Sequence, residues 1–170
     1  MTFAITGANG FLGVHIIHHL LKQGHTVRAI TRAGSSLAEF DKVKEFYKLV
    51  PESYATLTWH ECVLYDTEGL EEVFSGVDYI MHLAGVISYL GKDFNRLLEV
   101  NQQYTANVVN VAKDAGVKKL LYCSSIAAIA KSGTEEVIRE SAEWDDELPH
   151  SNNGHSMNLG ELEQWSGMAE

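Results

Sequence analysis

The chain is poor in several features that would place it in a special class. It has two prolines and two cysteines in 170 residues. It has no apolar run approaching the ~20 residues that a membrane helix needs. Its excess of acids, a net charge of −10, argues against nucleic acid as a partner. The sequence runs from Met1 directly into a strand-like segment, so we expect no signal peptide and a cytoplasmic protein.

The two cysteines carry no sign of special chemistry. Cys62 and Cys123 occupy positions typical of buried strands, and neither lies in a metal-ligand spacing. We expect reduced, structural thiols. The histidines show no metal-binding spacing either, because His15 and His19 are four residues apart but have no acidic third ligand in view. The sequence therefore predicts no metal site.

The amino-acid composition is typical of a globular protein, with 45% hydrophobic and 21% charged residues. The acids are unevenly placed, since residues 134–170 hold ten of them against one base, Arg139. This end of the chain is predicted to be a solvated loop and helix face, with a surface for a basic partner as the alternative.

The most informative segment is Thr6–Gly13, in which Gly7, Gly10 and Gly13 follow an apolar run and open a helical pattern. A glycine-rich turn between a strand and a helix brings backbone N–H groups and the positive end of a helix dipole to a phosphate. Glycine also lets the backbone approach the cofactor and lets the helix pack close to the sheet. The motif predicts a dinucleotide site, with the N–H groups of Phe11 and Leu12 facing the pyrophosphate.

Strand-like and helix-like segments alternate along the chain. The predicted strands are Phe3–Thr6, Thr26–Thr31, Thr56–Leu64, Tyr79–Leu83 and Lys119–Cys123. The predicted helices are Gly10–Gln23, Ser36–Leu49, Thr67–Phe74, Phe94–Ala115 and Met157–Met168. This order predicts an α/β fold with a doubly wound parallel sheet of strand order 3-2-1-4-5. We expect one domain over 1–170, with an acidic loop at 127–150 and a terminal helix at 157–168.

The ends of two strands refine the cofactor prediction. NAD-selective sites usually place an acid after the second strand, whereas this chain has Arg32 there. A guanidinium suits a 2′-phosphate, so NADP(H) is favoured over NAD(H), with a solvated loop arginine as the alternative. The segment His82–Gly85 has the small residues needed beside the adenosine ribose, and His82 is expected to be a packed strand histidine.

Four stretches together resemble the extended short-chain dehydrogenases/reductases, in particular the NAD(P)-dependent epimerase/dehydratase and dihydroflavonol-reductase-like branch. They are Thr6–Gly13, His82–Gly85, Asn101–Asn107 and Tyr122–Ala128. The resemblance implies a Rossmann fold, and it implies that Ser125 hydrogen-bonds a substrate oxygen. The expected cofactor-binding residues are Gly7, Asn9, Gly10, Phe11, Leu12, Gly13, Arg32, Val63, Leu64, Leu83, Ala84, Gly85, Cys123 and Ser124.

The chain lacks the catalytic pair that the resemblance implies, a Tyr-x-x-x-Lys after the fifth strand. No tyrosine follows Tyr122 and no lysine follows Lys131. One alignment puts Asn153 and Met157 at the two positions, and another puts His155 and Leu159 there. Asparagine exchanges no proton near neutral pH and methionine carries no charge, so we expect little or no turnover.

Two further departures concern the cofactor and the substrate. Val63 stands where the family usually has an aspartate that binds the adenine amino group, so cofactor affinity is expected to be reduced. Family members also continue into a sixth strand and a substrate-binding region, which we expect to be absent after Glu170. The resemblance further implies a homodimer through helices 94–115 and 157–168.

Three functions remain open at this point. The first is the cofactor-binding part of a reductase or epimerase. The second is a catalytically inactive dinucleotide sensor that signals through a partner. The third is a structural protein whose nucleotide site is a relic.

Overall fold

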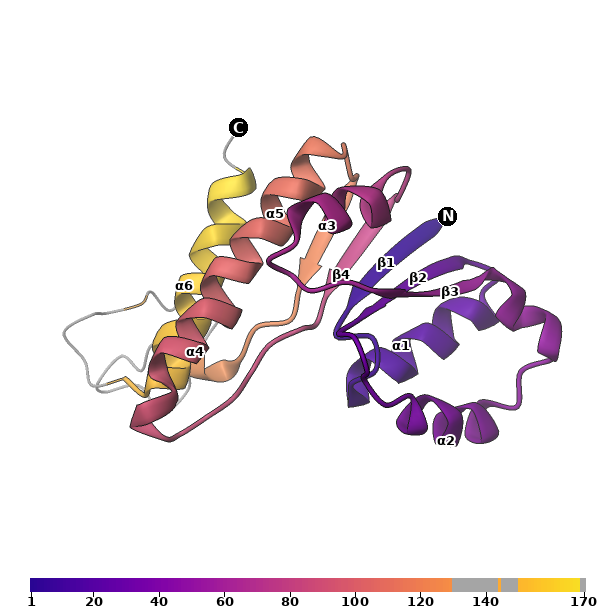
Figure 1. The fold of residues 1–170 in the computed structure, drawn as a ribbon, viewed down its shortest axis with the longest axis horizontal. Helices are drawn as coiled ribbons and strands as arrows, with labels where there is room; N and C mark the ends of the chain where they lie inside the picture. Colours follow the sequence, from indigo (N-terminus) through magenta and orange to yellow (C-terminus); the bar gives the residue numbers. More distant parts are fainter. Residues whose placement is uncertain (130–143, 145–149, 169–170) are drawn as a thin grey trace. The chain divides into compact units, whose positions relative to one another are not determined.

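A computed structural model describes residues 1–129, 144 and 150–168. Its centre is a parallel sheet of five strands in the order β3-β2-β1-β4-β5 (Figure 1). The strands are β1 (Thr2–Thr6), β2 (Thr26–Thr31), β3 (Leu57–Glu61), β4 (Tyr79–His82) and β5 (Lys119–Tyr122). The predicted Rossmann-like architecture and strand order are confirmed.

Helices and short turns connect the strands. The helices are α1 (Phe11–Lys22), α2 (Ala38–Tyr47), α3 (Thr67–Phe74), α4 (Phe94–Leu98), α5 (Tyr104–Asp114) and α6 (Asn152–Met168). The shorter turns are η1 (Pro51–Thr56), η2 (Gly91–Asp93), the π-helical η3 (Glu99–Gln103) and η4 (Ile126–Ala128).

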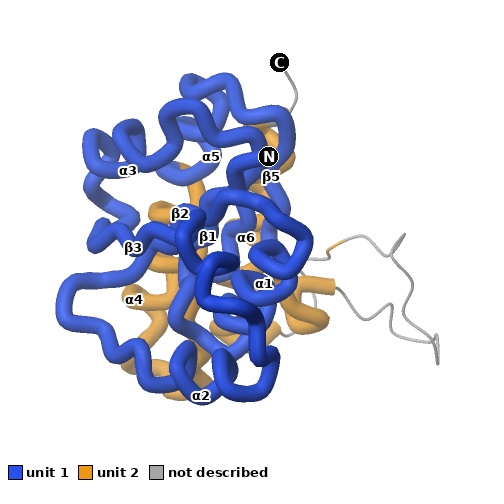
Figure 2. The backbone as a smooth tube through the Cα atoms, turned by 90° about the vertical axis from the view of Figure 1, so that its right-hand side faces the viewer, with its two compact units in different colours: residues 1–84, 107–123 blue, residues 85–106, 124–170 orange. Residues whose placement is uncertain are grey.

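The chain divides into two compact units (Figure 2). Unit 1 comprises Met1–Ala84 and Asn107–Cys123, and unit 2 comprises Gly85–Ala106 and Ser124–Glu170. Unit 1 contains the whole sheet. Unit 2 contains α4, η3, η4 and α6, with α6 packed against the other three. The expectation of a single domain over 1–170 stays a prediction.

The sheet of unit 1 is covered on both faces, as a doubly wound fold requires. Alternate residues of each strand point to opposite faces, so Ala4 and Ile30 pack with Leu70 and Phe74 of α3. Ile5 and the other strand residues of the opposite face pack with α1 and α2. Fully buried side chains of this size each contribute roughly 1.5–3 kcal/mol through the hydrophobic effect.

Helix ends in unit 1 follow local signals. Gly24, just beyond α1, has φ +76°, the left-handed conformation expected of a glycine that closes a helix. Asp66 caps α3, because its Oδ1 accepts a hydrogen bond from the Gly69 N–H at 3.0 Å. Thr26–Thr31 and Thr67–Phe74 have the predicted bounds, and most other bounds differ by one to three residues.

Three sequence expectations are wrong. The predicted helix Phe94–Ala115 is interrupted by the π-helical turn η3. The terminal helix begins at Asn152 rather than Met157, because Ser151 Oγ accepts the Gly154 N–H at 3.0 Å and so caps an earlier start. Cys123 is exposed rather than buried, because it follows β5, which the described sheet pairs only with β4, whereas Cys62 is buried as expected.

The acidic loop expected at 127–150 lies largely outside the described residues. No helix in the part of the chain that the structure describes is long and apolar enough to cross a membrane. Within those same ranges, no group of three His, Cys, Asp or Glu side chains is placed to hold a metal ion.

Candidate functional site

The glycine-rich turn connects β1 to α1 in unit 1, and two of its glycines are required by close contacts. Gly7 has φ +65°, and a Cβ there would lie 2.8 Å from the Ala84 backbone nitrogen. A Cβ on Gly13 would lie 2.5 Å from the Gly7 carbonyl oxygen. Gly10 is less constrained, since its Cβ would meet the same oxygen at 3.2 Å. Any side chain at the first two positions would force the turn apart.

The turn presents an open helix N-terminus. Gly10 is the N-cap of α1, no side chain caps the helix, and its first turn holds no acid. The first N–H groups of a helix have no intrahelical acceptor and carry the positive end of the dipole. Phe11 and Leu12 are exposed, and Asn9 Nδ2 donates to the Ser36 carbonyl at 3.3 Å. This arrangement fits the predicted anion-binding site.

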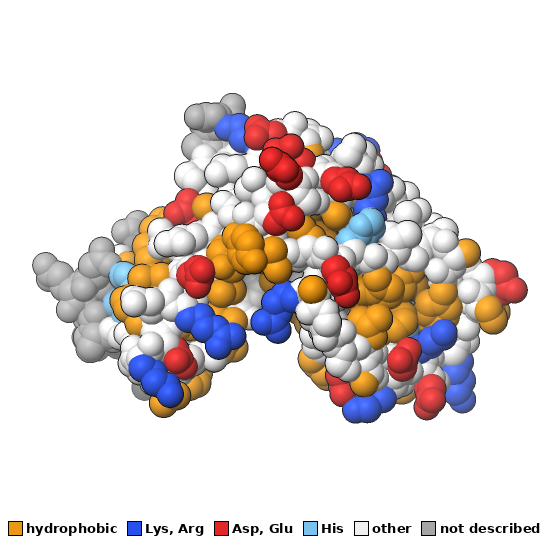
Figure 3. Space-filling view, viewed as in Figure 1, with side chains coloured by type: hydrophobic (Ala, Val, Ile, Leu, Met, Phe, Trp, Pro, Cys, Tyr) orange, Lys and Arg blue, Asp and Glu red, His pale blue; other side chains and the backbone are white. Residues whose placement is uncertain are grey.

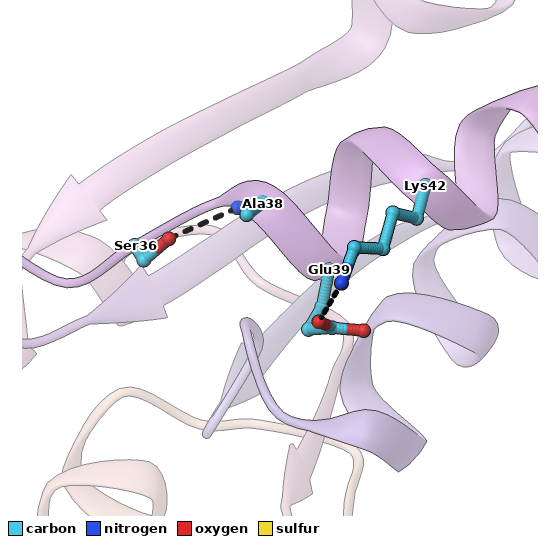
Figure 4. A network of polar contacts seen from close by, with 4 residues as sticks. All are labelled: Ser36, Ala38, Glu39 and Lys42. Carbon is cyan, nitrogen blue, oxygen red and sulfur yellow. Dashed lines mark hydrogen bonds and ion pairs between the residues drawn. The ribbon is translucent and has the colours of Figure 1, made fainter.

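Arg32 lies just beyond β2 and is exposed. Its carbonyl accepts the Ser35 N–H at 3.1 Å, and among the described residues its guanidinium makes no hydrogen bond or ion pair. The next segment leads into α2, where Ser36 Oγ accepts the Ala38 N–H at 3.2 Å (Figure 4). Lys42 and Glu39 pair at 2.6 Å in the first turns of α2 (Figure 4), so that acid is already engaged.

The structure adds an acid that sequence reasoning missed. Glu61, the last residue of β3, pairs in register with Thr31 of β2. Its Oε1 accepts the Gly34 N–H at 3.4 Å. The carboxylate therefore lies at the segment that follows Arg32. Only the pairing of β2 with β3 brings it there, so no local sequence signal marks it.

The end of β4 is fixed to β1 by a buried polar network. Thr6 Oγ1 accepts the Ala84 N–H at 3.2 Å and lies 2.6 Å from His82 Nδ1. The hydroxyl has one proton and two lone pairs, so it can donate to Nδ1 or accept from it, according to the tautomer of the ring. Burial lowers the pKa of His82 to about 4, so the ring is neutral at physiological pH. His82 is a packed strand histidine, as expected.

The predicted residues after β3 and β5 lie in the same unit. The Leu64 carbonyl accepts a hydrogen bond from Asn107 Nδ2 at 3.0 Å. The Val63 carbonyl accepts the Asp66 N–H at 2.9 Å, and its side chain offers no acceptor. The Cys123 N–H donates to the His82 carbonyl at 3.0 Å. These contacts shape the backbone at the carboxyl ends of the strands.

Unit 2 holds the remaining predicted residues, Gly85, Ser124, Ser125, Asn153 and Met157. Ser125 caps η4, where its Oγ accepts the Ala127 N–H at 3.2 Å. The first turn of α6 packs closely on η4, because a Cβ on Gly154 would collide with the Ala127 carbonyl oxygen.

The two α6 positions aligned with the catalytic pair are both buried. Asn153 is 2% exposed, and its Oδ1 is buried and has no hydrogen-bond partner among the described residues. Met157 is 6% exposed. In the alternative alignment His155 and Leu159 are half-buried. Neither pair offers a cation beside a proton donor.

Asn101 makes the central side-chain contacts of unit 2. It was not among the predicted site residues, although it is the first residue of Asn101–Asn107, one of the stretches that resemble the family. It lies in η3 and is 1% exposed. Its side chain accepts the Val86 N–H at 2.9 Å and donates to the Val86 carbonyl at 2.9 Å. Nδ2 also donates to Ser156 Oγ at 3.0 Å. One side chain thus joins the segment after β4 to α6.

These features define a Rossmann-like fold with a glycine-rich turn at a helix N-terminus, and comparison with known proteins identifies its family. Residues 3–157 match the NAD dependent epimerase/dehydratase family, so the chain belongs to that family.

Its relatives include a Synechocystis protein provisionally named dihydroflavonol 4-reductase, 32% identical over 82% of this chain and 37% of the relative. Dihydroflavonol 4-reductase of Callistephus chinensis is 28% identical over 85% of this chain and 39% of the relative. The chain thus spans less than half the length of these curated relatives.

A solved structure has the same fold over the whole chain. UDP-glucose 4-epimerase from Bifidobacterium longum, in complex with NAD⁺ and UDP, superposes with a TM-score of 0.79. The sequences are 22% identical, and the match covers 100% of this chain and 50% of the epimerase.

Proposed function

We propose that this chain binds an NAD(P)(H) dinucleotide through unit 1, as the cofactor-binding part of a reductase or epimerase. The observation that carries the proposal is the glycine turn, in which Gly7 and Gly13 have no room for a side chain beside an uncapped helix N-terminus. The family of the chain and the NAD⁺ bound by its structural relative support the same cofactor class. Calorimetric titration tests it, and no saturable binding of either dinucleotide would refute it.

The finer proposal is a preference for NADP(H), and it rests on Arg32. An exposed guanidinium at the end of β2 suits a 2′-phosphate, with two charge-assisted hydrogen bonds. Glu61 supports the opposite preference, because a carboxylate at Gly34 suits the 2′-hydroxyl of NAD(H). The proposal favours Arg32, since Glu61 reaches Gly34 at a long 3.4 Å.

Two substitutions separate these roles. Arg32→Asp is expected to weaken NADPH binding roughly 10- to 100-fold, the equivalent of a lost charge-assisted contact of about 1.5–3 kcal/mol, and to leave NADH binding nearly unchanged. Arg96→Asp, another exposed arginine, is the matched control for the change in net charge. If Arg32→Asp leaves selectivity unchanged while Glu61→Gln weakens NADH, the chain is an NAD(H) binder.

We propose further that the chain as it stands has little or no turnover. Ser125 is the residual site residue for a substrate oxygen, and Asn153 and Met157 occupy the positions of the family tyrosine and lysine. An amide and a thioether supply neither a proton nor a positive charge. General acid–base catalysis typically contributes about 10²–10⁴-fold, and that contribution is missing.

Restoring the pair tests this explanation. Asn153→Tyr with Met157→Lys is expected to give measurable NADPH oxidation with a panel of carbonyl compounds. Both positions are buried, so circular dichroism and NADPH binding must first establish that the double variant is folded. A folded, NADPH-binding variant with no gain in rate would show that the inactivity has another source.

The alternative function is a dinucleotide sensor, favoured by the same lack of catalytic groups at Asn153 and Met157. A sensor needs a partner whose affinity differs between NADP⁺ and NADPH, so equal affinities for all candidate partners would remove it.

We also propose a cytoplasmic homodimer that does not bind nucleic acid. Exposed Leu162 and Trp165 on α6 support a dimer surface, and basic side chains alternate with acidic ones on the face in Figure 3. A monomer at all concentrations in sedimentation would refute the dimer.

A further inference from the structure

Two short segments of unit 2 expose large apolar side chains. The segment that follows β4 carries Ile87, Tyr89 and Leu90, and η4, which follows β5, carries Ile126. These four side chains, called the apolar surface below, are 56% to 88% exposed. A single exposed apolar residue is ordinary, whereas a group of them at neighbouring places in a fold is typical of a binding surface.

Both segments are held on the same turn of α6. The side chain of Asn101 accepts the N–H and donates to the carbonyl of the residue before Ile87, each at 2.9 Å, and it also donates to Ser156 Oγ at 3.0 Å. A Cβ on Gly154 would collide with the carbonyl oxygen of the residue after Ile126. Gly154 and Ser156 lie two residues apart on α6. The two parts of the apolar surface therefore begin beside one helical turn.

The polar groups of the first segment are engaged within it. Ser88 Oγ donates to Asp93 Oδ2 at 2.7 Å and accepts the Leu90 N–H at 3.2 Å. Residues 85–90 and 124–128 include no charged side chain. Diphosphates are usually held by charge-assisted hydrogen bonds from arginine or lysine. These two segments thus offer a nucleotide sugar no cation of their own.

Ser125 supplies a hydrogen-bond donor next to Ile126. Its Oγ accepts the Ala127 N–H at 3.2 Å, and this bond does not use the hydroxyl proton. The proton can therefore be donated to an oxygen of a ligand. Both segments start at the carboxyl ends of parallel strands, where α/β folds bind their ligands. Apolar side chains with a few placed polar groups are typical of sites for small, mostly apolar molecules.

We propose that the apolar surface binds the ring system of a neutral carbonyl compound, whose oxygen accepts a hydrogen bond from Ser125. The absence of charge in both segments selects such a ligand over a nucleotide sugar. The inference deepens the proposed function, because it favours the reductase over the epimerase, and it rests on that function for the role of Ser125.

The apolar surface is tested with 2-acetylnaphthalene as the probe, by ligand-observed NMR titration of the full chain. Ile87→Ser and Ile126→Ser are each expected to weaken binding roughly three- to tenfold, because each removes apolar area that the ring buries. Phe46→Ser removes an exposed apolar ring from unit 1 and is the matched control, with affinity unchanged. Equal affinities in all four proteins would overturn the proposal. All three positions are exposed, and circular dichroism checks that each variant is folded.

Three further probes test the chemical class of the ligand. In the wild type, 2-ethylnaphthalene, which lacks the oxygen, is expected to bind more weakly than 2-acetylnaphthalene, and in folded Ser125→Ala the two should bind alike. The anion 2-naphthoate is expected to bind more weakly than the ketone, because the chain has a net charge of −10 and neither segment holds a cation. Tighter binding of 2-naphthoate or of UDP at a site that Ile126→Ser weakens would show that the ligand is anionic and would overturn the proposal.

A second copy of the chain is another occupant that the same variants detect. If Ile87→Ser and Ile126→Ser abolish self-association in sedimentation and leave the affinity for 2-acetylnaphthalene unchanged, the apolar surface is a subunit contact and the proposal is wrong. Titration with NADPH separates this inference from the proposed function. Binding of the ketone that depends on Ile87 and Ile126, without binding of NADPH, would refute the dinucleotide function alone. Binding of NADPH without binding of the ketone, in its presence or absence, would refute this inference alone.

Discussion

Acidification should destabilise unit 1 through His82, a fully buried histidine at the carboxyl end of β4. Its pKa in the folded protein is about 4, against 6.5 for an ordinary histidine. In that interval the unfolded chain binds a proton and the folded chain does not. Stability is therefore complete above pH 6.5 and falls until about pH 4. At 1.36 kcal/mol per pKa unit, the total loss from this one group is about 3 kcal/mol.

The assay is urea denaturation at a series of pH values from ~7.5 to ~4, followed by circular dichroism. Other groups also titrate in this range, so the informative quantity is the difference between wild type and His82→Asn. An asparagine offers the Thr6 hydroxyl an acceptor but takes up no proton. The variant loses packing at every pH, and its curve should be flatter than that of the wild type by about 3 kcal/mol over the interval.

His19→Asn provides the control, since His19 is exposed on α1. It makes the same chemical change as His82→Asn, but at an exposed ring rather than a fully buried one. Burial also lowers the pKa of His18, but that contribution is present in all three proteins and cancels in the difference. Parallel curves for wild type and His82→Asn would refute the reasoning, because they would mean that His82 is not desolvated in the folded state.

Two substitutions test the packing of the two units. Gly13→Ala is expected to destabilise unit 1 by about 1–3 kcal/mol, because its Cβ would lie 2.5 Å from the Gly7 carbonyl oxygen. Gly10→Ala, whose Cβ would lie 3.2 Å from the same atom, should lower the free energy of unfolding distinctly less. Urea denaturation measures both. Asn101→Ala is expected to cost about 2 kcal/mol by leaving the half-buried backbone groups of Val86 unpaired. Asn95→Ala, at an exposed position, should stay within ~0.5 kcal/mol. Equal effects within either pair would contradict the contacts on which it rests.

The strand and helix order was predictable because it depends on local patterns. Apolar runs covered on both faces, helical periodicity and closing glycines such as Gly24 each occupy a short window of sequence. The right-handed crossover rule then leaves few arrangements of five such strands. The start of α6 was missed for a local reason too, because Ser151 caps a polar stretch that has no hydrophobic period. The interruption of the helix at η3 has no comparable signal.

The only part of the candidate site that could be predicted from the sequence is the part formed by the backbone, the glycine-rich turn. The glycine turn depends on small residues close together in sequence, and the backbone contacts of Gly7 and Gly13 leave no room for a side chain. The contacts that individual side chains make at the site could not be predicted from the sequence. Glu61 reaches Gly34 only because β3 pairs with β2, and Asn101 reaches Val86 and Ser156 only because η3, α6 and the segment after β4 pack together.

By itself, the sequence determined the α/β alternation, the glycine turn and the absence of a Tyr-x-x-x-Lys pair, because each is a matter of which residues follow one another. Tertiary structure alone decided which polar atoms are buried and which hydrogen-bond partners they have. It gave His82 a low pKa beside Thr6, and it buried Nε2 of His18 without a hydrogen-bond partner among the described residues. Desolvation and pairing depend on atoms brought together by the folded sheet and its covering helices, and no window of sequence contains them.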